Sequence, residues 1–246
     1  MSEVSGNKRS ASRRPGLLPL FAWLSPAFPV GAFAYSHGLE QAVADREIGD
    51  ARSLTEWLVD LFERGSIRND LILASCAARA LGSPDASPGP ARRMVGPHFD
   101  EVAELALALS PSRERRLESR QQGRSFLEAV CAAWPSALLD SVLAGSPEIA
   151  YPVAFGAALA AHRLPLRPAL GAYALQFAGN LVSAIVRLGV IGQTEGQKVL
   201  ASLALRAEKA ARIAARSGLD DLGGAVLRAD LASLRHETKY SRIFRS

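Results

Sequence analysis

A long uncharged and mostly apolar run in the second half of the chain places the strongest limit on its fold. Residues 168–186 form a stretch of 19 residues without a charged side chain, bounded by Arg167 and Arg187. The run is long enough to cross a membrane, but it contains Gln176 and Asn180, and no aromatic belt flanks it. As a helix it is apolar almost all round, which is typical of a helix enclosed by others. We therefore expect a buried core helix and no membrane association.

The remaining sequence has helical periodicity. Apolar residues recur at i, i+3, i+4, i+7 and i+8 from Leu54 to Phe62, and the Ser-Leu-Thr-Glu sequence at 53–56 has the form of a capping box. No segment alternates polar and apolar residues with the period of a strand. The sequence thus predicts an all-α fold, a single-domain multi-helix bundle. Further helices are expected at residues 17–24, 69–80, 100–109, 111–134, 136–144, 152–162, 168–188, 194–217 and 220–234.

The helix expected at 111–134 changes character along its length. Pro111, just inside a Ser110 cap, opens it. Residues 113–124 are densely charged, with Glu114 and Glu118 interspersed among the arginines, whereas the second half is apolar. We expect the first half to be a solvated face that projects from the body, and not a basic patch.

Net charge divides the chain into a body and two basic ends. Residues 1–16 and 235–246 each carry a formal +3, so the total of +5 leaves −1 for residues 17–234. A nearly neutral body argues against the contiguous basic face that nucleic-acid binding requires. We expect 1–16 to be a disordered basic tail, 17–234 an all-α domain and 235–246 a docking tail, with a flexible loop at 82–97.

Residues that could carry catalysis or hold a metal are not clustered in the sequence. No glycine-rich phosphate loop and no nucleophile elbow occurs. We expect His37 to be a partly exposed polar residue. The pair His236–Glu237 could hold a cation, but we expect both side chains to lie on the surface without a specific role. No two histidines stand three or four residues apart, as a local metal site requires; they are His37, His98, His162 and His236. No catalytic and no metal residue is predicted.

The two cysteines indicate the redox compartment. Cys76 and Cys131 lie far apart in apolar surroundings, without a CxxC pair. Such cysteines are typical of inert thiols in a reducing compartment. Residues 1–15 are polar and basic and lack an apolar signal core. We therefore expect a cytoplasmic protein.

An unusual stretch at residues 25–40 begins as a turn and ends as a helix. It reads S-P-A-F-P-V-G-A-F-A-Y-S-H-G-L-E. Its prolines remove backbone donors, and Gly31 permits a sharp turn. Ser36 is placed to accept from the first N–H groups of the helix, and Glu40 lies in its positively polarised first turn. On chemistry alone, an ordinary buried corner explains this stretch.

The C-terminal residues 235–246 form a second unusual stretch. They read R-H-E-T-K-Y-S-R-I-F-R-S and mix cations with Tyr240, Ile243 and Phe244. Terminal tails seldom carry aromatic residues that nothing buries, and aromatic residues together with arginines anchor interfaces. We expect a segment that becomes ordered in the groove of a protein partner.

These two stretches, together with A-I-V-R-L and G-Q-T-E-G-Q-K-V-L within 184–203, resemble the UreF family of urease accessory proteins. The resemblance spans residues 17–246 and departs at 189–191, where Gly-Val-Ile stands in place of an expected Pro-Leu step. It implies an all-α homodimer that is not an enzyme and holds no stable cofactor. It further implies binding to the accessory protein UreD, also called UreH, and recruitment of the GTPase UreG, so that the complex delivers its nickel cargo to apo-urease.

The resemblance also implies two sets of site residues. Contact with UreD/UreH is carried over to Arg235, His236, Glu237, Tyr240, Arg242, Ile243 and Phe244. The family's N-terminal motif, expected to face UreG or a second copy, corresponds to Gly31, Phe33, Tyr35, Ser36, Gly38 and Glu40. Two other classes stay open: a basic helical nucleic-acid-binding or regulatory protein, and a small-molecule enzyme with a pocket in the helical core.

Overall fold

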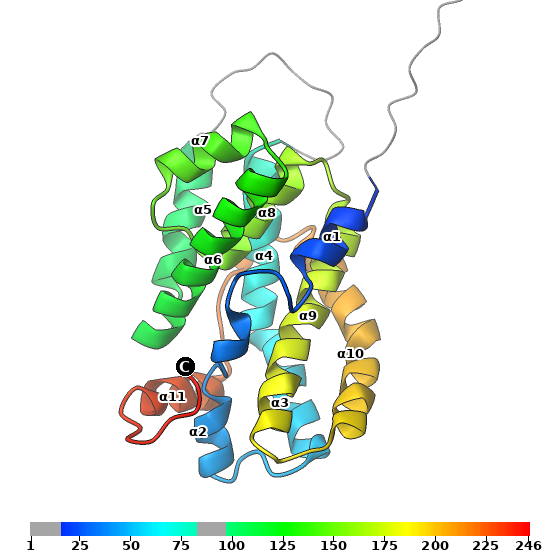
Figure 1. Cartoon of the computed structure of the whole chain (residues 1–246), viewed down its shortest axis with the longest axis vertical. Helices are drawn as coiled ribbons and strands as arrows, with labels where there is room; N and C mark the ends of the chain where they lie inside the picture. Colours follow the sequence, from blue (N-terminus) through cyan, green and yellow to red (C-terminus); the bar gives the residue numbers. More distant parts are fainter. Residues whose placement is uncertain (1–15, 83–96) are drawn as a thin grey trace, which may run out of the picture.

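A computed structural model describes residues 16–82 and 97–246, and every regular element within these ranges is helical (Figure 1). The predicted all-α fold class is thus confirmed. Two 3₁₀ turns, η1 and η2, span Ala32–Ala34 and Leu219–Asp221. The α-helices are α1 (Leu18–Trp23), α2 (Leu39–Ala44), α3 (Ala51–Arg64), α4 (Ser66–Ala80), α5 (Pro97–Ala108), α6 (Arg113–Ala133), α7 (Ala137–Gly145), α8 (Tyr151–Ala161), α9 (Leu166–Arg187), α10 (Gln193–Ala214) and α11 (Leu227–His236).

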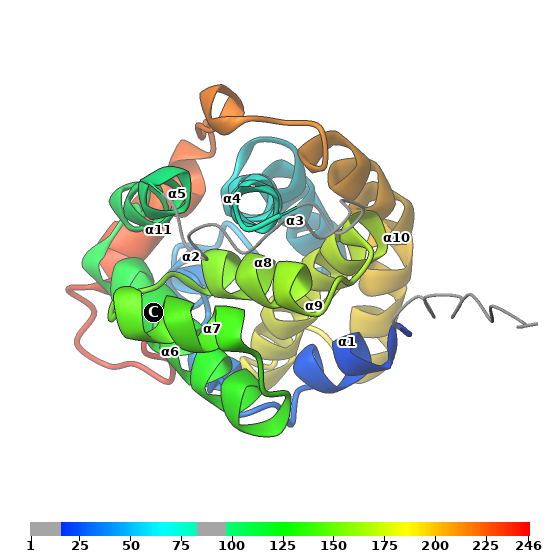
Figure 2. The same ribbon diagram turned by 90° about the horizontal axis from the view of Figure 1, so that it is seen from above.

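Helix α4 lies near the centre of the domain, as the view from above shows (Figure 2). It contacts α3, α5, α8, α9 and α10, and α8 in turn packs against α6. Every residue from Tyr151 to Ala160 is buried. A Cβ atom at Gly156 would lie 2.3 Å from the carbonyl oxygen of Ala74, so the absence of a side chain lets α8 approach α4 closely. The centre of the fold is therefore held by tight apolar packing.

The long apolar helix α9 is a core helix, as the uncharged run predicted. It is long and apolar enough to cross a membrane by length and composition alone, but 56% of its most apolar window is buried inside the domain. Its buried face carries Tyr173, Phe177 and Ile185 and packs against α10 and α4. Polar residues such as Asn180 lie on the other face.

Three helices have an N-cap that the sequence analysis did not predict. The N-cap of α3 is Asp50, whose carboxylate accepts from the Ser53 backbone N–H at 2.7 Å, so the capping box lies three residues earlier. Helix α6 is capped by Ser112 and not by Ser110, and α10 by Gly192, whose N–H donates to the Glu195 carboxylate at 3.1 Å. In each case a side-chain oxygen, from Asp50, Ser112 or Glu195, accepts from an otherwise unpaired N–H group at the start of the helix.

The last body helix differs most from its predicted range of 220–234. Helix α11 starts at Leu227, because η2 and an extended stretch precede it. In that stretch the Ala225 N–H donates to the Arg64 carbonyl at 3.0 Å, which ties it to the end of α3. The predicted tail at 1–16 and loop at 82–97 lie, apart from their end residues Gly16, Gly82 and Pro97, outside the described residues.

Candidate functional site

The two unusual stretches of the sequence lie against each other. After α11 the chain turns back, and its end reaches the region of α2 (Figure 1). The Arg245 N–H donates to the Ala34 carbonyl at 2.9 Å, and the Ser36 N–H donates to the Ser246 carbonyl at 2.7 Å. We call residues 240–246 the C-terminal segment and its contacts with the body the dock. The dock joins parts of the chain that are 210 residues apart.

The backbone of the motif is shaped for this contact. Gly31, His37 and Gly38 have φ of 70°, 56° and 79°, so the chain turns sharply on each side of Tyr35 and Ser36. At Gly38 a Cβ atom would also lie 2.7 Å from the backbone nitrogen of Ser233, which makes glycine necessary against α11. Ser36 Oγ accepts from the Glu40 N–H at 3.3 Å, although the N-cap position of α2 itself is Gly38.

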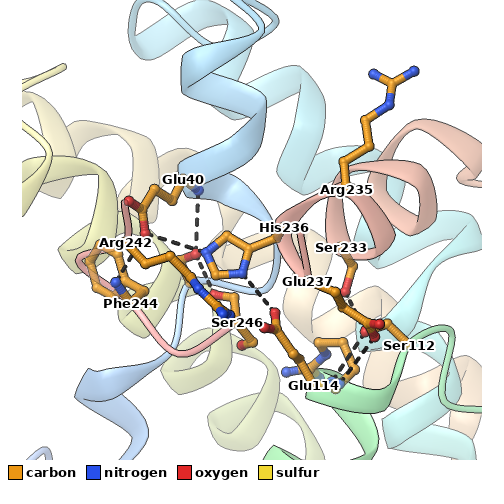
Figure 3. A network of polar contacts seen from close by, with 12 residues as sticks. Glu40, Ser112, Glu114, Ser233, Arg235, His236, Glu237, Arg242, Phe244 and Ser246 are labelled. Carbon is orange, nitrogen blue, oxygen red and sulfur yellow. Dashed lines mark hydrogen bonds and ion pairs between the residues drawn. The ribbon is translucent and has the colours of Figure 1, made fainter. Parts of the chain in front are cut away.

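Glu40 is the first of three acidic residues that hold the dock together. Its carboxylate accepts from the backbone N–H groups of Ile243, at 3.0 Å, and Phe244, at 2.9 Å (Figure 3). Burial by itself would raise the pKa of Glu40, but these hydrogen bonds together with His236 lower it overall. The charged form of Glu40 is therefore the one that binds the C-terminal segment.

The second acidic residue of the dock is Glu114, at the start of α6. The His236 side chain is fully buried, with Nδ1 2.7 Å from the Glu114 carboxylate and Nε2 3.4 Å from that of Glu40. Arg242 pairs with Glu114 from the solvent side. The expectation that His236 and Glu237 decorate the surface is wrong for His236, because its ring fills the space between two carboxylates (Figure 3). Glu237 caps α6 by accepting from the Arg113 N–H at 2.6 Å.

The third acidic residue of the dock is Glu118, one turn further along α6. It is 1% exposed and lies 2.7 Å from His37 Nε2, and it pairs with Arg115. Ser246 Oγ donates to it at 2.7 Å. Burial opposes its charge, but Arg115 and His37 hold the pKa of Glu118 at about 2. The prediction of a projecting, solvated face is wrong for the side of α6 that carries Glu118, which lies against the dock, and the N-cap Ser112 meets Ser233 at 2.7 Å. Arg113 and Arg116 are exposed, as expected.

Sequence reasoning missed Glu114 and Glu118 as site residues. A signal for them existed, because Glu114, Glu118 and Gln122 stand at i, i+4 and i+8, and so share one face of α6. Gln122 Nε2 donates to Glu118 at 2.9 Å. A polar stripe of this kind marks the face that meets another polar element.

The residues assigned to partner contact divide into two groups. Phe244 is buried, and the Arg187 guanidinium lies 4.4 Å from its ring centroid. Within the set, His236 and Phe244 are buried and Glu237 is partly buried; the exposed members are Arg235, Tyr240, Arg242 and Ile243. In the motif, Tyr35, Ser36, Gly38 and Glu40 are buried and Gly31 is partly exposed, so Phe33 alone presents a large exposed side chain.

An apolar groove borders the motif. It has a volume of about 560 Å³ and runs between α1, the turn at 25–33 and the exposed face of α9, with Phe21 and Phe33 exposed beside it. No group of three or more His, Cys, Asp or Glu residues in the described ranges is arranged to hold a metal ion. The described chain is thus a helical domain closed by its own C-terminal segment.

Comparisons with known proteins give the family. A family model described as UreF matches residues 48–204. The chain is 52% identical over 230 residues to a protein of Methylobacterium radiotolerans named Urease accessory protein UreF, covering 93% of this chain and 96% of the relative. Proteins with the same name from Xanthobacter autotrophicus and Rhodopseudomonas palustris strain HaA2 are 51% and 45% identical, covering 99% and 100% of this chain and 97% and 100% of those relatives.

The chain therefore belongs to the UreF family of urease accessory proteins. The family consists of non-catalytic chaperones of urease maturation, so the chain is not an enzyme. The resemblance that the sequence motifs indicated is confirmed over nearly the whole chain.

Proposed function

We propose that the chain binds a UreD/UreH-type protein, recruits the GTPase UreG to that complex, and so serves delivery of nickel to apo-urease. Membership of the UreF family supports the proposal. Nickel is the cargo of the assembled complex in this proposal, and the chain's own part is to present surfaces.

The observation that carries the proposal is the docked C-terminal segment. Tyr240 is fully exposed and Ile243 is 71% exposed, although Glu40 holds the backbone N–H groups of Ile243 and Phe244 in place. Apolar side chains on a fixed backbone bind a partner at a low cost in conformational entropy. We infer that UreD/UreH contacts Tyr240, Arg242 and Ile243 directly, whereas His236, Glu237 and Phe244 hold the segment in place.

Co-purification with a tagged UreD/UreH-type partner tests this division. Alanine at Tyr240 and at Ile243 together should abolish the complex without lowering the melting temperature of the chain, because neither side chain is buried. Ser241→Ala, at an exposed position between them, is the matched control and should co-purify normally. Retention of the complex by the double variant would contradict the proposed contact.

The apolar groove beside Phe33 supports a second interface, that of a homodimer. Exposed Phe21 and Phe33 on neighbouring elements form the kind of apolar patch that mediates association. We expect Phe21→Glu to convert a dimer into a monomer in light scattering. Leu205→Glu, on an equally exposed residue of α10 away from the groove, should leave the mass unchanged. A dimer that survives Phe21→Glu would favour UreG as the occupant of this face.

A further inference from the structure

A second pocket lies on the other side of the domain from the dock. It is a cavity of about 310 Å³ between α3, α4 and α10, and Figures 1 and 2 both show α10 on the side away from the C-terminal segment. Phe62 and Ile72 form part of its buried floor, and Ile213, which is 49% exposed, continues the apolar surface to the rim. The volume is at the lower end of the range for ligand pockets.

The rim of this pocket is strongly basic. Arg64, Arg68, Arg206 and Lys209 line it, against a single acidic residue, Glu63. The three helices α3, α4 and α10 thus contribute cations to one opening of a body whose formal charge is near −1 over 17–234. Within the described residues, none of the four cations takes part in an ion pair. The site therefore presents cations that its own structure does not neutralise.

The arrangement of the rim suits carboxylates on either side of an apolar group. Arg206 and Lys209 stand at i and i+3 and so share one face of α10, while Arg64 and Arg68 approach from the junction of α3 and α4. Arginine binds carboxylates with two parallel hydrogen bonds. The aliphatic stems of these side chains also extend the apolar wall of the pocket.

We propose that this pocket binds an acidic peptide segment of a protein partner, with one apolar side chain inserted into the cavity and flanking Asp or Glu residues paired with the rim. The basic rim favours a partner with acidic side chains. The apolar floor favours a peptide, because a peptide can also insert an apolar side chain, whereas a purely charged polymer cannot. The inference is independent of the UreD/UreH contact, because it involves neither the C-terminal segment nor the groove beside Phe33.

Fluorescence anisotropy on the full chain tests the proposal with a labelled probe peptide, Glu-Asp-Glu-Phe-Glu-Asp-Glu. The double variant Arg206→Glu/Lys209→Glu should weaken binding at least tenfold, since both side chains are exposed and their replacement leaves the core intact. The matched control is the variant pair Arg212→Glu and Arg216→Glu, which makes the same charge change at exposed positions outside the pocket lining. The control should change the affinity by less than twofold.

Two further arms distinguish the pocket from general charge attraction. A probe with Ala in place of Phe should bind at least fivefold more weakly, because it leaves the cavity unfilled. Equal loss of binding in the rim and control variants, or equal binding of the Phe and Ala probes, would overturn the proposal. Tighter binding of a single-stranded oligonucleotide than of the peptide, lost in the rim variant, would also overturn it and assign the pocket to nucleic acid.

Discussion

The dock and the α4–α8 contact hold the chain together by opposite means. In the α4–α8 contact, a helix buried along nearly its whole length meets a neighbour through small residues and apolar packing. In the dock, Phe244 is the only large apolar side chain of residues 240–246 that is buried. The segment is otherwise held by polar contacts, to the backbone of Ala34 and Ser36 and to the carboxylates of Glu40, Glu114 and Glu118. Apolar packing is insensitive to pH, whereas bonds to carboxylates require the charged form. We therefore expect the apolar core to stay folded when the pH falls, whereas the dock is the part that acid or a binding partner can open.

The largest expected effect comes from breaking the core. Gly156→Val should prevent folding, because its Cβ would lie 2.3 Å from the Ala74 carbonyl oxygen on a neighbouring buried helix. We expect a loss of about 4 kcal/mol or more in the free energy of unfolding. The measurement is the yield of soluble protein and its helical circular dichroism.

The control for this variant is another helical glycine. At Gly179 in α9, no atom lies within 4 Å of the added Cβ, so Gly179→Ala should be neutral or stabilising by about 0.5–1 kcal/mol. If Gly156→Val folds as well as Gly179→Ala, the close α4–α8 approach does not determine the stability of the core.

The next effect concerns the buried carboxylate of the dock. Glu118→Gln should lower the free energy of unfolding by about 3 kcal/mol, because Arg115 then lacks its charged partner in a buried site. Glu128→Gln removes an exposed ion pair with Arg124 on the same helix and should cost less than about 1 kcal/mol. Chemical denaturation of the two variants gives the comparison. Equal losses would mean that burial adds nothing to the Glu118 interaction.

The pH dependence of the same site has a definite sign. The pKa of Glu118 is lowered from 4.5 to about 2, so its contribution is complete above pH 4.5 and is lost as the pH falls towards 2. Wild-type protein should therefore lose stability across that window, and Glu118→Gln should lose less. Parallel acid titrations of the two proteins would contradict this assignment.

Asp70 should show the opposite behaviour. It accepts from the Tyr173 hydroxyl at 3.0 Å, and burial raises its pKa from 3.8 to about 6. The folded state then binds more protons than the unfolded state, so stability falls by about 3 kcal/mol as the pH rises through this window. Asp70→Asn keeps an acceptor but removes the charge. It should be more stable than wild type at pH 8 and nearly equal to it at pH 4, as denaturation at both values would reveal.

The sequence predicted the helices of this molecule better than it predicted the contact between its two unusual stretches. The helices of the described residues were expected in outline, and the errors fell at their ends. Asp50, Ser112 and Gly192 supplied unforeseen caps, and η2 with an extended stretch took the predicted first residues of α11. Both stretches that form the dock were recognised, but as separate features. Their contact across 210 residues has no local pattern, and the burial of Glu118 contradicts the usual solvation of a charged face.

The smallest expected effect on stability tests whether the C-terminal segment can detach while the helical body stays folded. Phe244→Ala should reduce stability by about 1–3 kcal/mol, less than a core Phe, because the segment can detach while the helical body stays folded. Ile243→Ala, next to it but 71% exposed, should change stability by less than about 0.5 kcal/mol. The backbone N–H groups of residues 243 and 244 donate hydrogen bonds to Glu40. Their hydrogen exchange should accelerate in Phe244→Ala and not in Ile243→Ala. Accelerated exchange throughout α8 as well would mean that the segment is part of the cooperative core, and that the division between a permanent core and an opening dock is wrong.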